Sequence, residues 1–172
     1  MALHSYCRCW VHLIWGTLNR EKVLNKEAAE RVSRYLHEYA ETKSVYMKIN
    51  YVNADHVHAL VDLPTSLSIE EVAQLLKGNS SHWINANDLI ARKFAWGRGY
   101  GAFSVSESNV GQVAAYIAGQ GQHHRVRTSL RSLRNSFTGM GCVNQRRTAI
   151  EMAWLRVHRR SPASSPVLTR CL

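Results

Sequence analysis

Residues 55–61, Asp-His-Val-His-Ala-Leu-Val, place two histidines in a short apolar stretch. Side chains of a strand alternate between the two faces of its sheet, so His56 and His58 are expected to share one face. The apolar residues around them are expected to point the other way, into a core: Val57, Ala59 and Val61. Two imidazoles about 7 Å apart along a strand can hold one divalent metal ion. The stretch therefore predicts a strand with a core on one side and two metal ligands on the other.

The pattern on either side of this strand predicts alternating strands and helices. We expect strands over 6–17, 45–51, 56–61 and 102–106, and helices over 26–43, from 68 to about 84 and from 109 to about 122. The order of the first six elements is that of the α+β, ferredoxin-like split β-α-β-β-α-β fold. Its helices cover one face of the sheet, so the histidine pair is expected on the other, open face.

Three local features refine this expectation. Ser68 and Glu71 form a capping box that opens the second helix, and residues 78–81 either interrupt that helix or lie on its polar side. Asn109 and Gln112 resemble a capping pair for the last helix. In the second strand, Val45, Met47, Ile49 and Tyr51 alternate with more polar residues and are expected on one face.

The last helix carries an apolar stripe beside a polar one. Tyr116 and Gln120 lie four residues apart on the polar stripe, so their side chains project together, about 6 Å apart. A phenol is a weak nucleophile at neutral pH because its pKa is near 10. A metal ion held by an amide oxygen beside it would polarise a phosphate for attack. Taken singly, a polar strand face and a half-buried aromatic ring are the plainer explanations of the histidines and Tyr116.

Together these motifs resemble the single-tyrosine HUH-endonuclease transposases, the insertion-sequence and REP-associated group. The matching segments are His56-Val57-His58, 76–81, 96–100 and Tyr116-Ile117 followed by Gln120 and His123-His124. The resemblance implies an added C-terminal helix that carries the nucleophile, Tyr116. It also implies Mg²⁺ or Mn²⁺ on His56, His58 and Gln120, a 5′-phosphotyrosine intermediate, single-stranded DNA with a hairpin as substrate, and a homodimer.

Five further residues in the matching segments are candidate DNA contacts: Lys77, Asn79, Ser80, Arg98 and Tyr100. Polar and basic side chains of this kind contact phosphates, and an aromatic ring stacks on unpaired bases. A solvated helix side explains the first three equally well. The residues themselves leave both interpretations open.

The charge of the chain is unevenly distributed. The net charge of the 172 residues is +10, but residues 1–120 hold 12 basic and 11 acidic residues. Residues 121–172 hold ten arginines and one acidic residue, so the excess lies almost entirely in this part. We expect a catalytic domain over 1–124 and an Arg/Ser-rich tail over 125–172. This tail is expected to be poorly ordered, or to be a divergent or frame-shifted end. In the second case this copy would be inactive if the segment it replaces supports catalysis or dimer exchange.

Other classes of protein fit the sequence less well. The four cysteines form no Cys-x-x-Cys pair, and no apolar run reaches 18 residues. The first residues do not have the pattern of a signal peptide, so we expect a cytoplasmic protein without a membrane span. A noncatalytic or decayed single-stranded nucleic-acid-binding module on the same fold is the main alternative, but such modules place aromatic residues on the open face. A nicking enzyme of replication or conjugation would need further domains.

Overall fold

Four strands form one antiparallel sheet in the computed structural model, which describes residues 6–120. The strands are β1 (Trp10–Gly16), β2 (Tyr46–Val52), β3 (His56–Asp62) and β4 (Gly101–Val105). Their order across the sheet is β2-β3-β1-β4, so β1 lies between β3 and β4. This order confirms the ferredoxin-like arrangement predicted from the sequence, in which each helix connects two parallel strands that are separated by a third.

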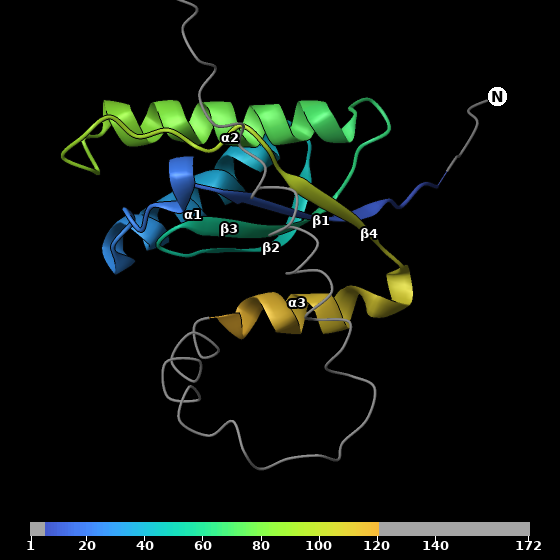
Figure 1. Cartoon of the computed structure of the whole chain (residues 1–172). Coiled ribbons are helices and arrows are strands. Elements are labelled where there is room, and N and C mark those ends of the chain that lie inside the picture. Colours follow the sequence, from blue (N-terminus) through green and yellow to red (C-terminus); the bar gives the residue numbers. More distant parts are fainter. Residues whose placement is uncertain (1–5, 121–172) are drawn as a thin grey trace, which may run out of the picture. The chain divides into compact units, whose positions relative to one another are not determined.

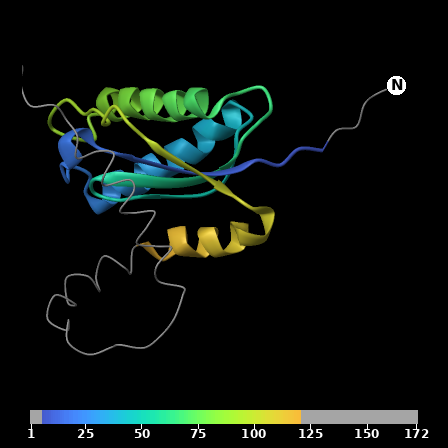
Figure 2. The ribbon, with the colours of Figure 1, turned by 45° about the vertical axis from the view of Figure 1, so that its right-hand side comes forward.

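The helices occupy both sides of the sheet (Figures 1 and 2). The two long helices, α1 (Lys26–Thr42) and α2 (Ile69–Ala86), cover one face. The short helix α3 (Val110–Ala118) lies against the opposite face, after a 3₁₀ turn over Glu107–Asn109. The predicted order of strands and helices is thus confirmed, and so is the added C-terminal helix.

The face under α1 and α2 holds the main hydrophobic core. Inward residues of β1 and β3 meet the apolar sides of the two helices there, and the largest of them, Trp15, has no exposed surface. The alternation predicted for β3 is confirmed because Val57, Ala59 and Val61 are all fully buried in this core. His56 and His58 therefore lie on the opposite face, beside α3.

A β-bulge in β2 changes which of its side chains face the main core. The register of β2 on β3 shifts between Met47 and Ile49, and this places an extra residue in β2. Met47 packs in the main core, whereas Ile49 and Tyr51 pack on the α3 side. The expectation of a single apolar face from Val45 to Tyr51 is wrong for this reason, because an inserted residue exchanges the two faces beyond it.

The second helix is continuous through Gly78–Ser81, so these residues do not interrupt it. The expectation that all four lie on its polar side is wrong for Ser80, which is fully buried. The predicted capping box of this helix is present. The Ser68 hydroxyl accepts a hydrogen bond from the Glu71 backbone N–H at 3.2 Å, and the Ser68 N–H donates to the Glu71 carboxylate at 2.7 Å. The helix therefore begins where the sequence indicates.

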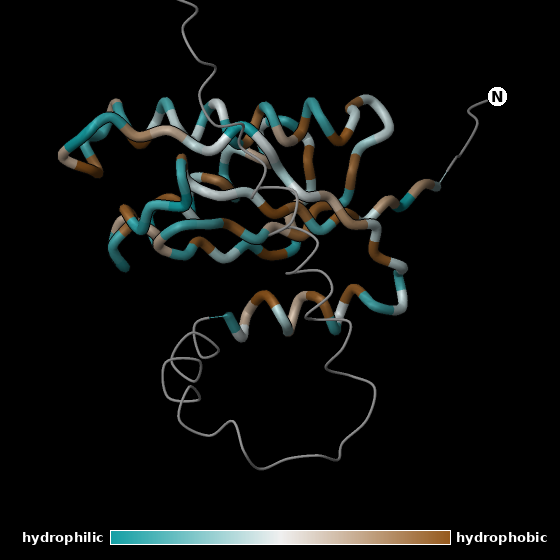
Figure 3. The backbone as a smooth tube through the Cα atoms, in the orientation of Figure 1, coloured by the Kyte–Doolittle hydropathy of each residue, from teal (hydrophilic) through white to brown (hydrophobic). Residues whose placement is uncertain are grey.

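Helix α3 covers part of the sheet face that the sequence led us to expect open. Val110 and Ile117 pack on Trp10 and Leu60 in a second hydrophobic cluster, and Figure 3 shows hydrophobic segments of α3 on the side toward the sheet. The expected Asn109 cap is also wrong. The preceding 3₁₀ turn holds Asn109 in a right-handed helical conformation, and its side chain makes no capping hydrogen bond.

Several predictions concern residues outside the described part of the chain. These are the predictions for residues 121–122, for the segment His123-His124 and for the proposed tail over 125–172. Within the described residues, α3 ends at Ala118, earlier than the predicted end near residue 122. The structure divides into the units Met1–Arg134 and Asn135–Leu172, and residues 6–120 belong to the first. Among the described residues, no helix combines the length and apolar character needed to cross a membrane.

Candidate active site

The histidine pair of β3 lies on the sheet face toward α3. His56 is 9% and His58 3% exposed, so neither imidazole is solvated as it would be on an open sheet face. Their ring centroids are 5.0 Å apart and their planes are inclined by 76°. Alternation along β3 thus brings two potential nitrogen ligands side by side in a partly dehydrated position.

A third histidine, His12 of β1, joins this pair. His12 is 3% exposed, and its ring stacks on that of His58 at a centroid distance of 5.3 Å. A distance of 3.1 Å separates His12 Nε2 from His58 Nδ1, which is a hydrogen bond. Burial lowers the pKa of His12 to about 4, so its ring is neutral at pH 7.

Sequence reasoning assigned no role to His12. His12 lies on the same face as His58 because it alternates with Val11 and Leu13, which face the main core. However, the contact between the two rings depends on the antiparallel register of β1 and β3, in which Ile14 is paired with His58 and His12 with Leu60. A diagonal neighbour of this kind cannot be read from either strand alone.

Asp55 precedes the pair and contacts the other histidine. Its Oδ1 lies 2.6 Å from His56 Nδ1, and its Oδ2 lies 3.3 Å from a guanidinium nitrogen of Arg20. Burial alone would raise the pKa of Asp55. The hydrogen bond and electrostatic interaction with His56, and those with the Arg20 guanidinium, outweigh burial and lower the pKa to about 2. Asp55 is therefore an ionised acceptor beside the histidine pair.

Tyr116 of α3 lies against the same histidines. Its ring centroid is 6.0 Å from that of His58 and 6.4 Å from that of His12, with both contacts edge-to-face. The tyrosine and the histidine pair are 58 or more residues apart in the sequence. Packing of α3 on the sheet therefore brings together, within one chain, the two motifs that carried the sequence argument.

Gln120 lies just after the end of α3, four residues beyond Tyr116. It is only 3% exposed, and its Nε2 has no hydrogen-bond partner among residues 6–120. A buried N–H donor without an acceptor is costly, and a bound group with an acceptor oxygen, such as a phosphate, would relieve that cost. No group of three His, Cys, Asp or Glu side chains within residues 6–120 is arranged to hold a metal ion. Two imidazoles would thus need a donor of another kind, such as an amide oxygen or a phosphate.

Comparison with known proteins shows the family to which the chain belongs. The family model described as "Transposase IS200 like" matches residues 5–120, a range that contains the histidines, Tyr116 and Gln120. The chain belongs to the IS200-like transposase family. The resemblance to single-tyrosine transposases that the sequence motifs indicated is therefore confirmed.

Individual members of the family support the same assignment. Transposases for insertion sequence element IS200 from Salmonella typhimurium and Salmonella typhi are each 27% identical over 122 residues, which is 68% of this chain and 80% of theirs. A putative transposase from Deinococcus radiodurans R1 superposes with a TM-score of 0.56 at 26% identity, over 70% of this chain and 95% of that one.

A second solved structure shows the same fold at lower identity. A REP-associated tyrosine transposase bound to a REP hairpin gives a TM-score of 0.53 at 12% identity, over 72% of this chain and 74% of that chain. Together with the Deinococcus structure, it shows that the sheet and helices described above have the architecture of this transposase family.

The candidate DNA contacts of this family member lie away from the histidines, on α2 and the segment after it. Lys77 Nζ donates hydrogen bonds to the backbone carbonyls of Arg98 at 3.1 Å and Gly99 at 2.9 Å, and it lies 5.9 Å from the centre of the Tyr100 ring. Burial lowers the pKa of Lys77. Lys77, Arg98 and Tyr100 also line one pocket, so the structure brings three of the five candidates together.

The other two candidates make hydrogen bonds within the protein. Asn79 Nδ2 donates to the Leu75 carbonyl at 3.0 Å. Ser80 has no exposed surface, and its hydroxyl accepts a hydrogen bond from Trp96 Nε1 at 2.9 Å. The exposed Arg98 and the half-buried Tyr100 have more surface to offer a nucleic acid than Ser80 has.

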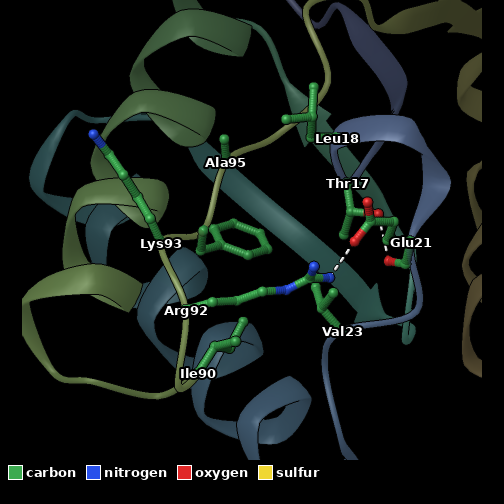
Figure 4. Close-up of a pocket in the computed structure, with 9 residues that line it drawn as sticks. Thr17, Leu18, Glu21, Val23, Ile90, Arg92, Lys93 and Ala95 are labelled. Carbon is green, nitrogen blue, oxygen red and sulfur yellow. Dashed lines mark hydrogen bonds and ion pairs between the residues drawn. The ribbon is translucent and has the colours of Figure 1, made fainter.

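A separate small pocket lies between the segment after β1 and the segment after α2 (Figure 4). Arg92 reaches across it to form an ion pair with Glu21. The Thr17 hydroxyl donates to the Glu21 carbonyl at 2.7 Å, and the Thr17 N–H donates to the Asp55 carbonyl at 2.9 Å. These contacts fix the segment 17–21, which contains Arg20, beside Asp55.

Proposed function

We propose that this member of the IS200-like family is a metal-dependent transposase that cleaves and rejoins single-stranded DNA through a covalent link to Tyr116. The observation that carries the proposal is the contact of the Tyr116 ring with His58, 6.0 Å between centroids, on the face that holds the histidine pair. This contact supports the proposal because it joins a candidate nucleophile to two candidate metal ligands on different elements.

The chemistry assigns one role to each group. The Tyr116 oxygen would attack the phosphorus and lose its proton, the bond from phosphorus to the 3′ oxygen would break, and that oxygen would leave as a 3′-hydroxyl. The 5′ phosphate would remain on Tyr116. Attack by the 3′-hydroxyl of another strand reverses the step, and because the phosphodiester energy is kept in the covalent link, rejoining needs no ATP.

The residues present fit a bound Mg²⁺ or Mn²⁺. His56 and His58 would supply nitrogen ligands, and Gln120 would supply its amide oxygen. The buried Gln120 Nε2, which has no hydrogen-bond partner among the described residues, would then donate to a phosphate oxygen of the DNA. The metal would polarise the scissile phosphate and so help a weak nucleophile. Ionised Asp55 lies behind His56 and favours a metal-binding imidazole.

Two further parts of the proposal concern the substrate and the assembly. We propose a DNA hairpin beside the cleavage site as the recognised element, by analogy with the REP hairpin bound by the structural neighbour. We also propose a homodimer. The position of Tyr116 against its own histidines supports cleavage by groups of one chain, because no partner chain is needed to complete this contact.

The test is covalent trapping on labelled hairpin oligonucleotides taken from the DNA that flanks the coding sequence. With Mn²⁺, the protein should form a DNA adduct that survives boiling in detergent, and Tyr116→Phe should abolish the adduct while hairpin binding persists. Tyr51→Phe is the matched control, because Tyr51 is paired with His58 across β2 and β3 and packs in the same cluster.

The outcomes separate the proposal from its rivals. An adduct that persists in Tyr116→Phe and disappears in Tyr51→Phe would show that Tyr51, and not Tyr116, is the nucleophile. Hairpin binding by the unchanged protein without any adduct in Mn²⁺ would favour the noncatalytic or decayed binding module.

A further inference from the structure

Each histidine of the pair is contacted through the same ring atom by a different residue. His56 Nδ1 lies 2.6 Å from Asp55 Oδ1, and His58 Nδ1 lies 3.1 Å from His12 Nε2. One contact comes from the residue that precedes β3 and the other from β1, the next strand of the sheet. Two contacts of different origin therefore hold the two imidazole rings by the same atom, Nδ1.

Hydrogen bonding at Nδ1 decides which nitrogen can bind a metal. A neutral imidazole has one N–H and one lone pair, and an ionised carboxylate can only accept. His56 Nδ1 therefore carries the hydrogen and donates it to Asp55, which leaves the lone pair of His56 on Nε2. When His12 Nε2 accepts, His58 has the same tautomer. The reverse bond would place hydrogen on His58 Nε2 and block that atom as a ligand.

We propose that Asp55 and His12 are positioning residues, which hold His56 and His58 by Nδ1 so that both imidazoles present Nε2 to one metal ion. This inference rests on the proposed metal-dependent function and adds to it the residues that orient the ligands. It assigns a role to His12, the histidine for which the sequence offered none.

Both positioning residues are themselves held in place. Arg20 contacts Asp55 from a turn in which Asn19 and Arg20 have φ values of 56° and 61°. Asparagine adopts this left-handed conformation readily, but it is unfavourable for arginine. His12 is fixed by its stack on His58 and by Phe103 of β4, whose ring centroid is 6.3 Å away. Asp55 is therefore held by an arginine in a strained conformation, and His12 is held by close packing of its ring.

The test begins with the unchanged full-length protein without metal. Nitrogen NMR of histidine side chains distinguishes the two tautomers, and both His56 and His58 should carry hydrogen on Nδ1. His12→Phe keeps a ring in place but removes the acceptor, so His58 should become a mixture of tautomers. Mn²⁺ affinity, measured by titration calorimetry, should fall about 10–100-fold, as is typical when the partner of a metal ligand is removed.

Conservative and matched variants separate positioning from packing. His12→Gln can place an amide oxygen near the position of Nε2 and should restore the His58 tautomer and most of the Mn²⁺ affinity. Ile14→Val removes one methyl group from the residue paired with His58 and should change neither quantity. Asp55→Asn keeps an acceptor for His56 and should bind Mn²⁺ better than Asp55→Ala.

Two results would overturn the inference while leaving the proposed function in place. One is hydrogen on His58 Nε2 in the unchanged protein, and the other is unaltered Mn²⁺ affinity in a folded His12→Phe variant, provided that the Tyr116 adduct still forms. Failure of the unchanged protein to bind Mn²⁺ would instead remove both the metal-dependent function and the positioning role.

Discussion

At the scale of single residues, Ser80 links α2 to the segment that follows it. Its hydroxyl donates to the Leu76 carbonyl at 2.6 Å and accepts from Trp96 Nε1 at 2.9 Å, all without exposure to solvent. Trp96 in turn packs edge-to-face on Trp15 at 6.1 Å. Ser80 therefore satisfies the one polar atom of a tryptophan that lies in the main core.

Ser80→Ala should destabilise the protein by about 1–3 kcal/mol, because it leaves Trp96 Nε1 buried without an acceptor. The measurement is the free energy of unfolding in urea. Ser81→Ala is the control, since the Ser81 hydroxyl makes only a long contact of 3.4 Å with the Phe94 carbonyl. Equal losses in the two variants would show that the tryptophan hydrogen bond contributes nothing specific.

The candidate site could be predicted only in part at this scale. The spacing of His56 and His58 indicated a shared face, and the structure places both there. The contacts of His12 with His58 and of Arg20 with Asp55 join residues 46 and 35 positions apart. The first contact depends on the register of β1 and β3, and the second on the turn at Asn19 and Arg20. Periodic patterns in the sequence predict neither of them.

At the scale of elements, α3 depends on the sheet for its stability. It has nine residues, and isolated helices of this length are not stable in water. Ile117 is fully buried and packs with Leu60 and Trp10 in the cluster beneath the helix. The position of Tyr116 next to the histidines is therefore a consequence of this packing.

Ile117→Ala should release α3 from the sheet, because truncating a buried isoleucine costs about 2–5 kcal/mol. Amide hydrogen exchange should become faster in residues 110–118 than in β1 and β3, and the yield of the Tyr116 adduct should fall more than hairpin affinity. Gln112→Ala, at an exposed position of the same helix, is the control and should change neither. Protected α3 amides in Ile117→Ala would contradict this dependence.

At the scale of the whole molecule, charge and candidate site lie in different parts of the chain. Residues 1–120 are nearly neutral, with 12 basic and 11 acidic residues, whereas ten arginines follow in residues 121–172. Attraction between a protein and DNA at low salt comes mainly from its excess basic residues. We expect the arginine-rich part to supply most of the attraction that does not depend on DNA sequence.

Replacing Arg125, Arg127, Arg131 and Arg134 together by glutamine should weaken the salt dependence of single-stranded DNA binding. The slope of log K against log salt should decrease by about 0.7 for each arginine that neutralises a phosphate. The slope is measured by fluorescence anisotropy between about 50 and 200 mM salt, the range over which such binding weakens strongly. Lysine at the same positions should preserve the slope. An unchanged slope in the glutamine variant would assign the attraction to other basic residues.

The sequence by itself determined the order of strands and helices, the shared face of His56 and His58, and the helix that carries Tyr116. These are properties of neighbouring residues, because strand and helix periods act over a few positions. Only the tertiary structure decided that a bulge turns Ile49 and Tyr51 toward α3, that α3 covers the histidine face, and that His12 reaches His58. Each of these depends on how distant segments pair and pack, which local patterns do not encode.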